Sequence, residues 1–196
     1  MRVLIVLVFS ARLSAQGVSL GLRTGLVVNP IITAEAGQRF TLGPYLETRL
    51  WRGAAIDVDV LLQRPAFEVT PARSRVTIWQ VEAPVTLIYR FRGRPKPFVR
   101  TGVAFNRVFA VKGAAPCARG PFGEQFYCVD GSPVAELRHR GTSGFVIGGG
   151  IGWKLGKLRL DPEVRVTHWI DRNFGVRDSA VRSNLNEAAL LFGVTF

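Results

Sequence analysis

The sequence contains no run of eighteen or more apolar residues in its 196 positions. A membrane-spanning helix needs about 20 such residues in succession, so the chain has no helical membrane span. It has only two histidines, His139 and His168, and its arginines and lysines form no dense block despite a net charge of +12. Metal sites, cofactor motifs and nucleic-acid recognition leave stronger patterns than these. We therefore expect no metal, no cofactor and no nucleic-acid partner.

The amino terminus has the arrangement of an export signal. Met1 and Arg2 give a basic start, and an unbroken apolar run follows from Val3 to Phe9. Such a run is within the range of a signal-peptide core, and the following small residues place the cut after Ala15. We predict that residues 1–15 are a signal peptide and that residues 16–196 form a single domain. The alternative is that Val3 to Phe9 is a buried first strand.

Cysteine is scarce as well, with Cys117 and Cys128 the only two. They have ten residues between them, in a Gly- and Pro-rich stretch from residue 112 to 133. In an exported chain this pair predicts a disulfide, and closing so short a loop stabilises a fold by about 3 kcal/mol. A metal or redox pair is the alternative, but neither a CxxC spacing nor a neighbouring histidine supports it.

What the sequence does contain is alternation of apolar and polar residues. A period of two indicates a strand with one apolar face. Eight segments follow it: Val18–Val28, Arg39–Trp51, Ala54–Gln63, Arg75–Phe91, Pro97–Val111, Gly144–Leu155, Lys157–Ile170 and Asn186–Phe196. Each is about long enough to cross a bilayer as a tilted strand, which needs roughly nine to eleven residues.

The connections between these segments alternate in length. Arg52–Gly53, Arg92–Lys96 and Gly156 are short, whereas Asn29–Gln38, Arg64–Ser74, Lys112–Ser143 and Asp171–Leu185 are long. Short turns on one side and long loops on the other are typical of membrane barrels. We predict an all-β protein, an eight-stranded antiparallel up-and-down transmembrane β-barrel with short periplasmic turns and long extracellular loops.

One stripe of each segment is apolar, and the opposite stripe carries charges. The charged residues expected in the barrel interior are Arg23, Glu47, Arg49, Asp57, Asp59, Glu82, Arg90, Arg100, Arg159, Asp161, Glu163, Arg165 and Glu187. Six arginines thus face seven carboxylates. Because an unpaired buried charge is strongly destabilising, we expect these side chains to pair across the lumen and to form a salt-bridged plug.

A glycine-rich run from Gly148 to Gly152 lies inside one segment. A phosphate-binding loop would need a helix after it, and here the strand pattern continues instead. Gly148, Gly150 and Gly152 fall on the inward stripe, beside segments that supply Arg100 and Arg165. We expect the glycines to leave room for long arginine side chains.

The last segment ends on an aromatic carboxyl terminus. Its alternation places one set of residues on a single face: Ala188, Leu190, Phe192, Val194 and Phe196. A final strand that ends in Phe resembles the carboxy-terminal signal by which bacterial barrels are recognised for insertion. This resemblance implies the barrel-insertion machinery as a partner.

A soluble lipocalin-like barrel is the structural rival, because it uses the same alternation with the apolar stripe turned inward around a ligand. The aromatic residues favour the membrane barrel, since they fall in two bands where interfacial girdles are expected. These are Trp153, Tyr89, Phe91 and Phe196 at the periplasmic end, and Trp79, Phe40 and Phe145 towards the outer end.

The stretch from Glu82 to Phe91, followed by that from Lys96 to Gly102, is similar to the outer-membrane protein β-barrel domain family. In that family, a Pro-bearing strand ending in Tyr-basic-Phe turns through a Lys-Pro pair into an aromatic, glycine-containing strand. The whole mature chain resembles the small OmpA-type barrels. The resemblance implies a location in the bacterial outer membrane and carries no catalytic residues.

Some eight-stranded barrels modify lipid A, which makes His168 a candidate catalytic residue. A lipid A deacylase would place a His and a Ser two residues apart, with an acid nearby to orient the His. Here Ile170 occupies the serine position, although Glu187 could serve as the acid. We therefore predict that the protein is not an enzyme.

The outer loops remain as the candidate binding surface. Their basic residues include Arg64, Arg73, Lys112, Arg119, Arg138, Arg140, Arg172, Arg177 and Arg182. Outer-membrane lipid, and the phosphates of lipopolysaccharide in particular, are suitable partners for such residues. We expect a monomeric structural or surface-binding protein, with a small diffusion channel or a lipid A-modifying enzyme as the alternative functions.

Overall fold

The chain consists of β-strands joined by turns and loops throughout the residues that the computed structural model describes. These are residues 17–29, 32–33, 39–69, 74–121, 123–130, 132–175 and 182–196. In that part of the chain, no helix is long and apolar enough to cross a membrane. The predicted signal peptide and its cleavage site lie outside the described residues.

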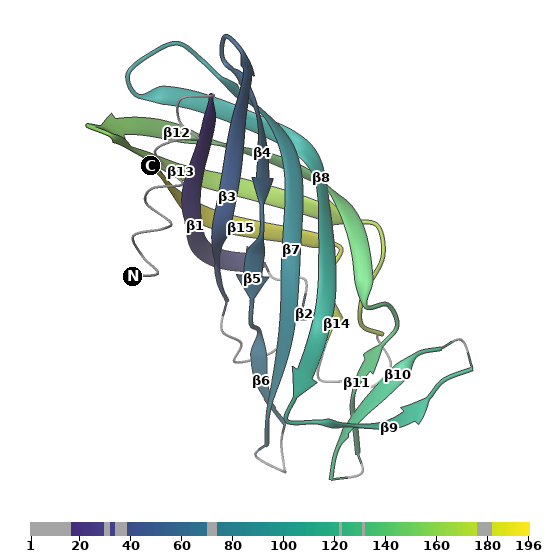
Figure 1. The fold of residues 1–196 in the computed structure, drawn as a ribbon. Helices are drawn as coiled ribbons and strands as arrows, with labels where there is room; N and C mark the ends of the chain where they lie inside the picture. The colour runs from purple at the N-terminus through teal and green to yellow at the C-terminus, as the bar shows by residue number, and fades with distance from the viewer. Residues whose placement is uncertain are drawn as a thin grey trace.

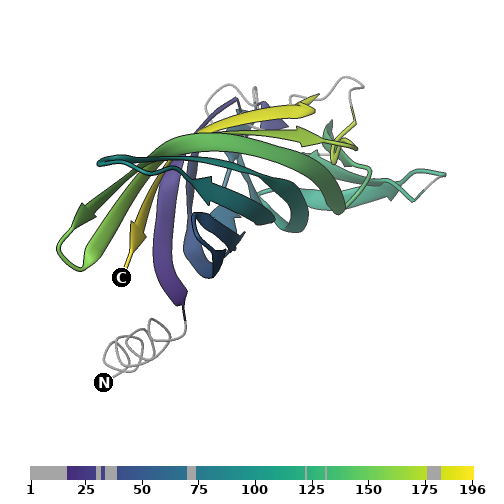
Figure 2. The same ribbon diagram turned by 90° about the horizontal axis from the view of Figure 1, so that it is seen from above.

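The main body is a closed antiparallel barrel of eight strands, one of them broken in two (Figure 1). The strands are β1 (Val18–Asn29), β3 (Phe40–Trp51), β4 (Ala54–Asp59) continued by β5 (Leu61–Gln63), β7 (Ser74–Arg90), β8 (Lys96–Lys112), β12 (Gly141–Leu155), β13 (Leu158–Trp169) and β15 (Asn186–Thr195). Neighbours along the chain pair with each other, and β1 pairs with both β3 and β15 (Figure 2). This pairing closes the sheet and confirms the predicted up-and-down barrel.

The break between β4 and β5 falls at Val60. Its backbone N–H donates to the carbonyl oxygen of Pro44 on β3 at 3.0 Å, so the chain keeps its place in the sheet. Beyond the break, β5 continues to pair with β3 and β7. The other predicted strand boundaries lie within three residues of the observed ones.

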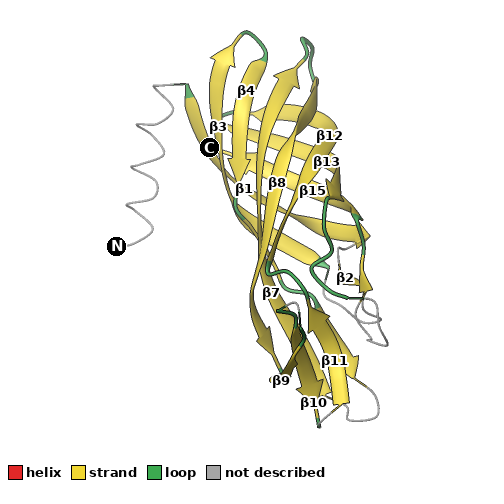
Figure 3. Cartoon of the chain, turned by 90° about the vertical axis from the view of Figure 1, so that its right-hand side faces the viewer, coloured by secondary structure: helices red, strands yellow, loops and turns green. Residues whose placement is uncertain are grey.

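The two ends of the barrel differ. At the turn end, residues 52–53, 91–95 and 156–157 join consecutive strands. At the opposite end, the loop end, the connections contain the strands β2 (Ile32–Thr33), β6 (Ala66–Val69), β9 (Ala115–Arg119), β10 (Gln125–Val129), β11 (Ser132–Leu137) and β14 (Arg182–Ser183). The sequence analysis treated these connections as loops and did not find the strands within them, because strands this short leave too little alternation to detect. Strands β9, β10 and β11 form a separate sheet beyond the barrel (Figure 3).

The outer wall of the barrel is apolar. Side chains of the predicted apolar stripes are about half exposed there, for example Leu26 at 57%, Ile147 at 64% and Val164 at 55%. Soluble proteins rarely expose a continuous apolar surface of this extent, and a lipocalin-like barrel would bury this stripe around its ligand. The outward apolar stripe therefore favours a membrane barrel and contradicts the soluble rival.

Aromatic side chains lie near both ends of this wall. At the turn end, the rings of Tyr89 and Phe91 meet edge to face with their centres 5.1 Å apart. Towards the loop end, Phe40 and Phe145 have exposed rings. Aromatic bands of this kind are enriched where a membrane wall meets water.

An apolar cluster fills the barrel interior near the loop end. Its buried members are Val76, Ile78, Ala104, Val108, Tyr127, Val129, Ala135, Leu137, Val146, Trp169 and Phe174. They come from β7, β8, β12 and β13 of the barrel, from β10 and β11 of the separate sheet, and from the segment after β13. The separate sheet is therefore anchored to the barrel by buried apolar contacts.

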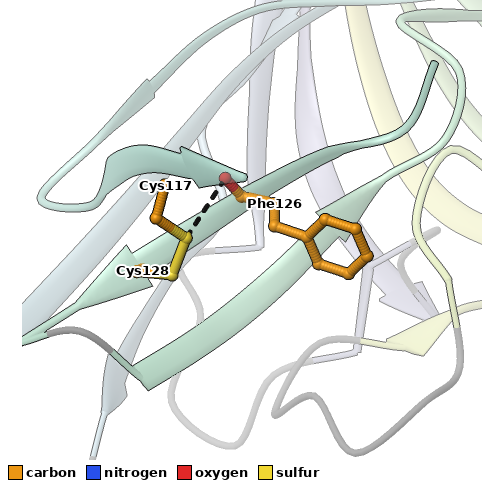
Figure 4. Close-up of a disulfide and its surroundings, with 3 residues drawn as sticks. All are labelled: Cys117, Phe126 and Cys128. Atoms are coloured by element: carbon orange, nitrogen blue, oxygen red, sulfur yellow. Dashed lines mark hydrogen bonds between the residues drawn. A yellow bond between two sulfur atoms is a disulfide. The ribbon is translucent and has the colours of Figure 1, made fainter. Parts of the chain in front are cut away.

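The predicted disulfide between Cys117 and Cys128 is present. It joins β9 to β10, with the two Cα atoms 5.8 Å apart (Figure 4). Because β9 and β10 are adjacent antiparallel strands, the bond crosslinks two strands of the separate sheet. It does not involve a strand of the barrel.

Leu190 provides a test of the membrane-facing wall. It lies midway along β15 with 51% of its side chain exposed. Leu190→Arg is expected to lower the free energy of unfolding in lipid vesicles by roughly 2 to 4 kcal/mol, because a charge near the bilayer midplane loses its water. Denaturant titration of the refolded protein measures this change, with Leu190→Ala as a control that adds no charge. Unchanged stability in Leu190→Arg would contradict contact with hydrocarbon.

The disulfide allows a second test. Reduction of Cys117–Cys128 is expected to leave the barrel folded, because the bond lies in the separate sheet. The fast migration of the unheated barrel in detergent gels should persist after reduction. Thiol mapping of protein from intact envelopes should find both cysteines bonded. Loss of the fast-migrating form on reduction would show that the barrel depends on this bond.

Candidate functional site: the ion-pair network of the barrel interior

Six charged side chains meet in the barrel interior. This central cluster consists of Arg23, Asp57, Asp59, Arg100, Glu163 and Arg165, with side chains at most 2% exposed. Its members come from β1, β4, β8 and β13. Residues two apart on a strand share a face, which is why Asp57 and Asp59 point into the same space.

Every arginine of the central cluster contacts more than one carboxylate. Arg165 lies 2.8 Å from both Asp59 and Glu163. Arg100 Nε lies 3.1 Å from Glu163, and its Nη1 lies 3.7 Å from Asp59. Arg23 pairs with Asp59 as well. The shared carboxylates link the three arginines into one network.

Asp57 completes the charge balance of the central cluster. Its Oδ2 lies 3.1 Å from Arg23 and 3.5 Å from Arg100. Three arginines thus face three carboxylates, so no net charge is left in this buried layer. Removing one member of a buried ion pair leaves the other charge buried without a partner. This loss is far more destabilising than the loss of a surface ion pair.

A second layer, the turn-end cluster, contains Glu47, Arg90, Arg159 and Asp161. Glu47 lies 2.6 Å from both arginines. Asp161 lies 3.2 Å from Arg90 and 2.8 Å from Arg159. These side chains are up to 21% exposed, so this layer lies closer to water than the central cluster. Its two positive and two negative charges also balance.

Two aromatic rings pack among the arginines. The guanidinium carbon of Arg23 lies 4.2 Å from the centre of the Tyr45 ring. The centre of the Phe98 ring is 4.8 Å from Arg90 and 5.8 Å from Arg100. An aromatic face attracts a cation without adding a charge, so Phe98 joins the two charged layers.

Glycines on β12 make space for this interior. A Cβ on Gly148 would lie 3.2 Å from Cγ of Arg100 and 3.3 Å from Oε1 of Glu163. Gly148 therefore leaves room for an arginine, as expected from the sequence. At Gly150 a Cβ would come within 2.6 Å of the Phe98 ring. That glycine accommodates an aromatic ring and not an arginine, which corrects the expectation.

Nearer the loop end, two carboxylates lie in an amide cluster with two glutamines. Gln63 Nε2 donates to Glu82 at 2.8 Å and to Glu187 at 3.2 Å. Gln80 Nε2 donates to Gln63 at 2.6 Å. The space that Gln63, Glu82 and Glu187 line together with Arg165 is too small for a water molecule. The amide cluster thus continues the packing of the interior.

Twelve of the thirteen charged residues predicted for the lumen lie in these three clusters. Arg49 is the exception, because its side chain is exposed near the turn end, next to a bulge between Arg49 and Trp51. Its assignment to the lumen was wrong, since a strand end lies at the mouth of the barrel, where water solvates a charge.

Uncharged residues of the interior were missed by the sequence analysis. They are Tyr45, Gln63, Gln80, Thr86 and Phe98, all buried. Thr86 accepts a hydrogen bond from Arg100 at 3.4 Å. Each missed residue stands an even number of positions from a charged inward residue on its strand, so strand parity could have found it.

The basic residues predicted for the outer loops are spread around the loop end. Those with exposed side chains are Arg64, Lys112, Arg119, Arg138, Arg140 and Arg172. Arg73, Arg177 and the side chain of Arg182 lie outside the described residues. Arg138 pairs with Glu136 at 2.9 Å, so its positive charge is partly neutralised by a neighbouring carboxylate.

Comparison with known proteins identifies the architecture. No protein-family model and no curated protein matches the sequence. The crystal structure of Neisserial surface protein A matches with a TM-score of 0.54 and 15% identity, over 91% of this chain and 96% of that one. The outer membrane protein OprG from Pseudomonas aeruginosa matches with a TM-score of 0.55 and 13% identity, over 91% and 94% of the two chains. The chain has the fold of the small outer-membrane β-barrels.

The described residues of this barrel do not assemble the arrangement of a deacylase. His168 is exposed and hydrogen-bonds through Nδ1 to Oδ1 of Asn186 at 2.7 Å. Glu187 is buried in the interior, on the opposite face of the wall. The two residues therefore cannot share a catalytic site. Among the described residues, no three His, Cys, Asp or Glu side chains gather in a group that could hold a metal.

The predicted insertion signal lies on β15 and at the residue after it. Leu190, Phe192 and Phe196 are exposed on the wall of the barrel, and Ala188 and Val194 are half-buried. All five therefore lie on the outward face that the alternation predicts. Their recognition during insertion stays a prediction.

Two arginines provide a matched test of the network. Arg165→Met is expected to lower the free energy of unfolding by about 3 to 5 kcal/mol, because it removes a shared partner from Asp59 and Glu163. Arg49→Met deletes the same charge at the exposed turn end and is expected to change stability little. Denaturant titration in the same lipid measures both variants. If both variants lost the same free energy of unfolding, the buried ion pairs of Arg165 would contribute no more to stability than an exposed charge does.

Proposed function

We propose that the chain is a closed β-barrel of the bacterial outer membrane that acts as a structural or surface-binding protein. In this proposal, residues 1–15 direct export, the turn end faces the periplasm, and the loop end faces outward. The insertion machinery recognises the final strand that ends in Phe196, and the barrel acts as a monomer.

The observation that carries the closed lumen is the ion pair between Arg165 and Asp59. The sheet order places β13 and β4 on opposite sides of the eight-stranded barrel. The 2.8 Å contact between the two side chains therefore crosses the lumen. An interior of eight strands is only just wide enough for side chains to fill, so a bridge across it leaves little space for solute.

A small diffusion channel is the alternative function. A channel needs polar side chains arranged around a continuous water-filled path. Here the polar side chains contact one another, and the space beside Gln63 and Glu82 is too small for water. These contacts favour the closed barrel. A lipid A-modifying activity has less support, since His168 and Glu187 face opposite sides of the wall.

The loop end supports a role in surface binding. All five residues of β9 are exposed, and Arg119 lies at its end. Other exposed cations at this end are Arg64, Lys112 and Arg172. In an outer leaflet these side chains would be surrounded by phosphorylated glycolipid, to which arginine binds through charge-assisted hydrogen bonds.

Single-channel recording in planar bilayers tests the closed lumen. The wild-type barrel is expected to show no steady conductance. Arg100→Ala is expected to admit ions intermittently, because it removes a buried side chain and unbalances the charges of Asp57 and Glu163. Arg49→Ala, at the exposed turn end, should stay silent. A steady, large conductance of the wild type would contradict the proposal and favour the diffusion channel.

A further inference from the structure

Two cations lie over one tryptophan on the outer wall near the loop end. The guanidinium carbon of Arg64 is 4.6 Å from the centre of the Trp79 ring, and Nζ of Lys112 is 5.7 Å from it. The ring of Phe109 lies 6.2 Å from the same ring. We call Arg64, Trp79, Phe109 and Lys112 the platform. Two like charges held against one ring form a region of positive potential.

A β-bulge in β8 builds this platform. Trp79 is opposite Ala110, whereas its neighbour Gln80 is opposite Val108, so Phe109 is an extra residue in β8. A bulge changes the face to which the following side chains point. Lys112 is therefore opposite Thr77 and lies on the outward face with Trp79. Without the bulge, the alternation would turn Lys112 to the inner face.

A groove lies beside the platform on the same wall. It has a volume of about 460 Å³, and its lining includes Val81, Ala83, Phe105, Arg107 and Asp171. Val81 and Arg107 stand opposite each other in the pairing of β7 and β8. Val81 lies two residues after Trp79 on β7, and Arg107 lies two residues before Phe109 on β8. The groove thus runs from the apolar wall of the barrel up to the cations of the platform.

The positive charges of this region lack carboxylate partners within the described part of the chain. Arg64, Arg107 and Lys112 form no ion pair there with an acidic side chain. Asp171 is the carboxylate that lines the groove, and it stands against three cations, Arg64, Arg107 and Lys112. These cations outnumber the carboxylate by three to one, so the net charge of the region is positive.

We propose that the platform and the groove bind a phosphorylated glycolipid of the outer leaflet. A phosphate group lies among Arg64, Lys112 and Arg107, and apolar parts of the lipid lie along Val81, Ala83 and Phe105. This inference rests on the proposed function, in which the loop end faces the outer leaflet. A lipid fits better than a free phosphate, because the groove adjoins the apolar wall and so offers contacts that an inorganic ion cannot use.

The test compares lipid binding by the folded full-length barrel in zwitterionic micelles, followed by native mass spectrometry. The probes are bisphosphorylated lipid A, the same lipid without phosphates, and inorganic phosphate. Arg64→Gln combined with Lys112→Gln is expected to weaken binding of the phosphorylated lipid by about tenfold or more, since charge-assisted hydrogen bonds are lost. Lys154→Gln combined with Lys157→Gln removes two exposed cations at the turn end and is expected to leave binding unchanged within about twofold.

Three outcomes would overturn the proposal: equal weakening in both double variants, equal binding of the lipid without phosphates, or full displacement of the lipid by inorganic phosphate at equal concentration. Insertion into vesicles is measured on the same samples. A barrel that inserts and stays closed but binds lipid A equally in the platform variant contradicts this inference alone. A barrel that fails to insert contradicts the proposed function.

Discussion

Charges inside a narrow barrel must be paired or hydrogen-bonded, and this constraint governs the rest of the structure. With little water available, each arginine needs a carboxylate within reach. The central and turn-end clusters meet this need with equal numbers of both signs. Because Arg165 reaches Asp59 from the opposite wall at 2.8 Å, pairing also holds the two sides of the barrel together. A closed lumen follows from the same contacts that make the buried charges tolerable.

The uncharged residues of the interior pack around these ion pairs. Gly148 lies against Arg100, Gly150 lies against Phe98, and Phe98 in turn contacts arginines of both charged layers. Towards the loop end, the amide cluster and then the apolar cluster replace the ion pairs. The interior therefore changes from charged to apolar along the barrel axis. This gradient lets the separate sheet attach through apolar contacts and away from the ion pairs of the barrel.

The alternation of residues predicted the strands and their faces well, because strand parity depends only on local geometry. It could not predict which charges meet, since parity fixes a face but not the height of a residue along the barrel. Arg49 shows this limit, with inward parity but an exposed position at the mouth. Lys112 shows another, because the bulge at Phe109 reverses the parity of the residues after it. Strands β9 to β11 escaped prediction because each is short, two of them contain a proline, and glycines lie in the segments between them.

Access of water to the interior tests the closed, paired core most directly. Thr86 is buried beside Arg100, and Thr86→Cys in a background with Cys117→Ser and Cys128→Ser places one small thiol there. A small water-soluble thiol reagent should leave this cysteine unmodified in the folded barrel and modify it in denaturant. Arg92→Cys, in the exposed turn after β7, should react at once in both states. Modification of Thr86→Cys in the folded barrel as fast as Arg92→Cys would show a water-filled lumen and contradict the account.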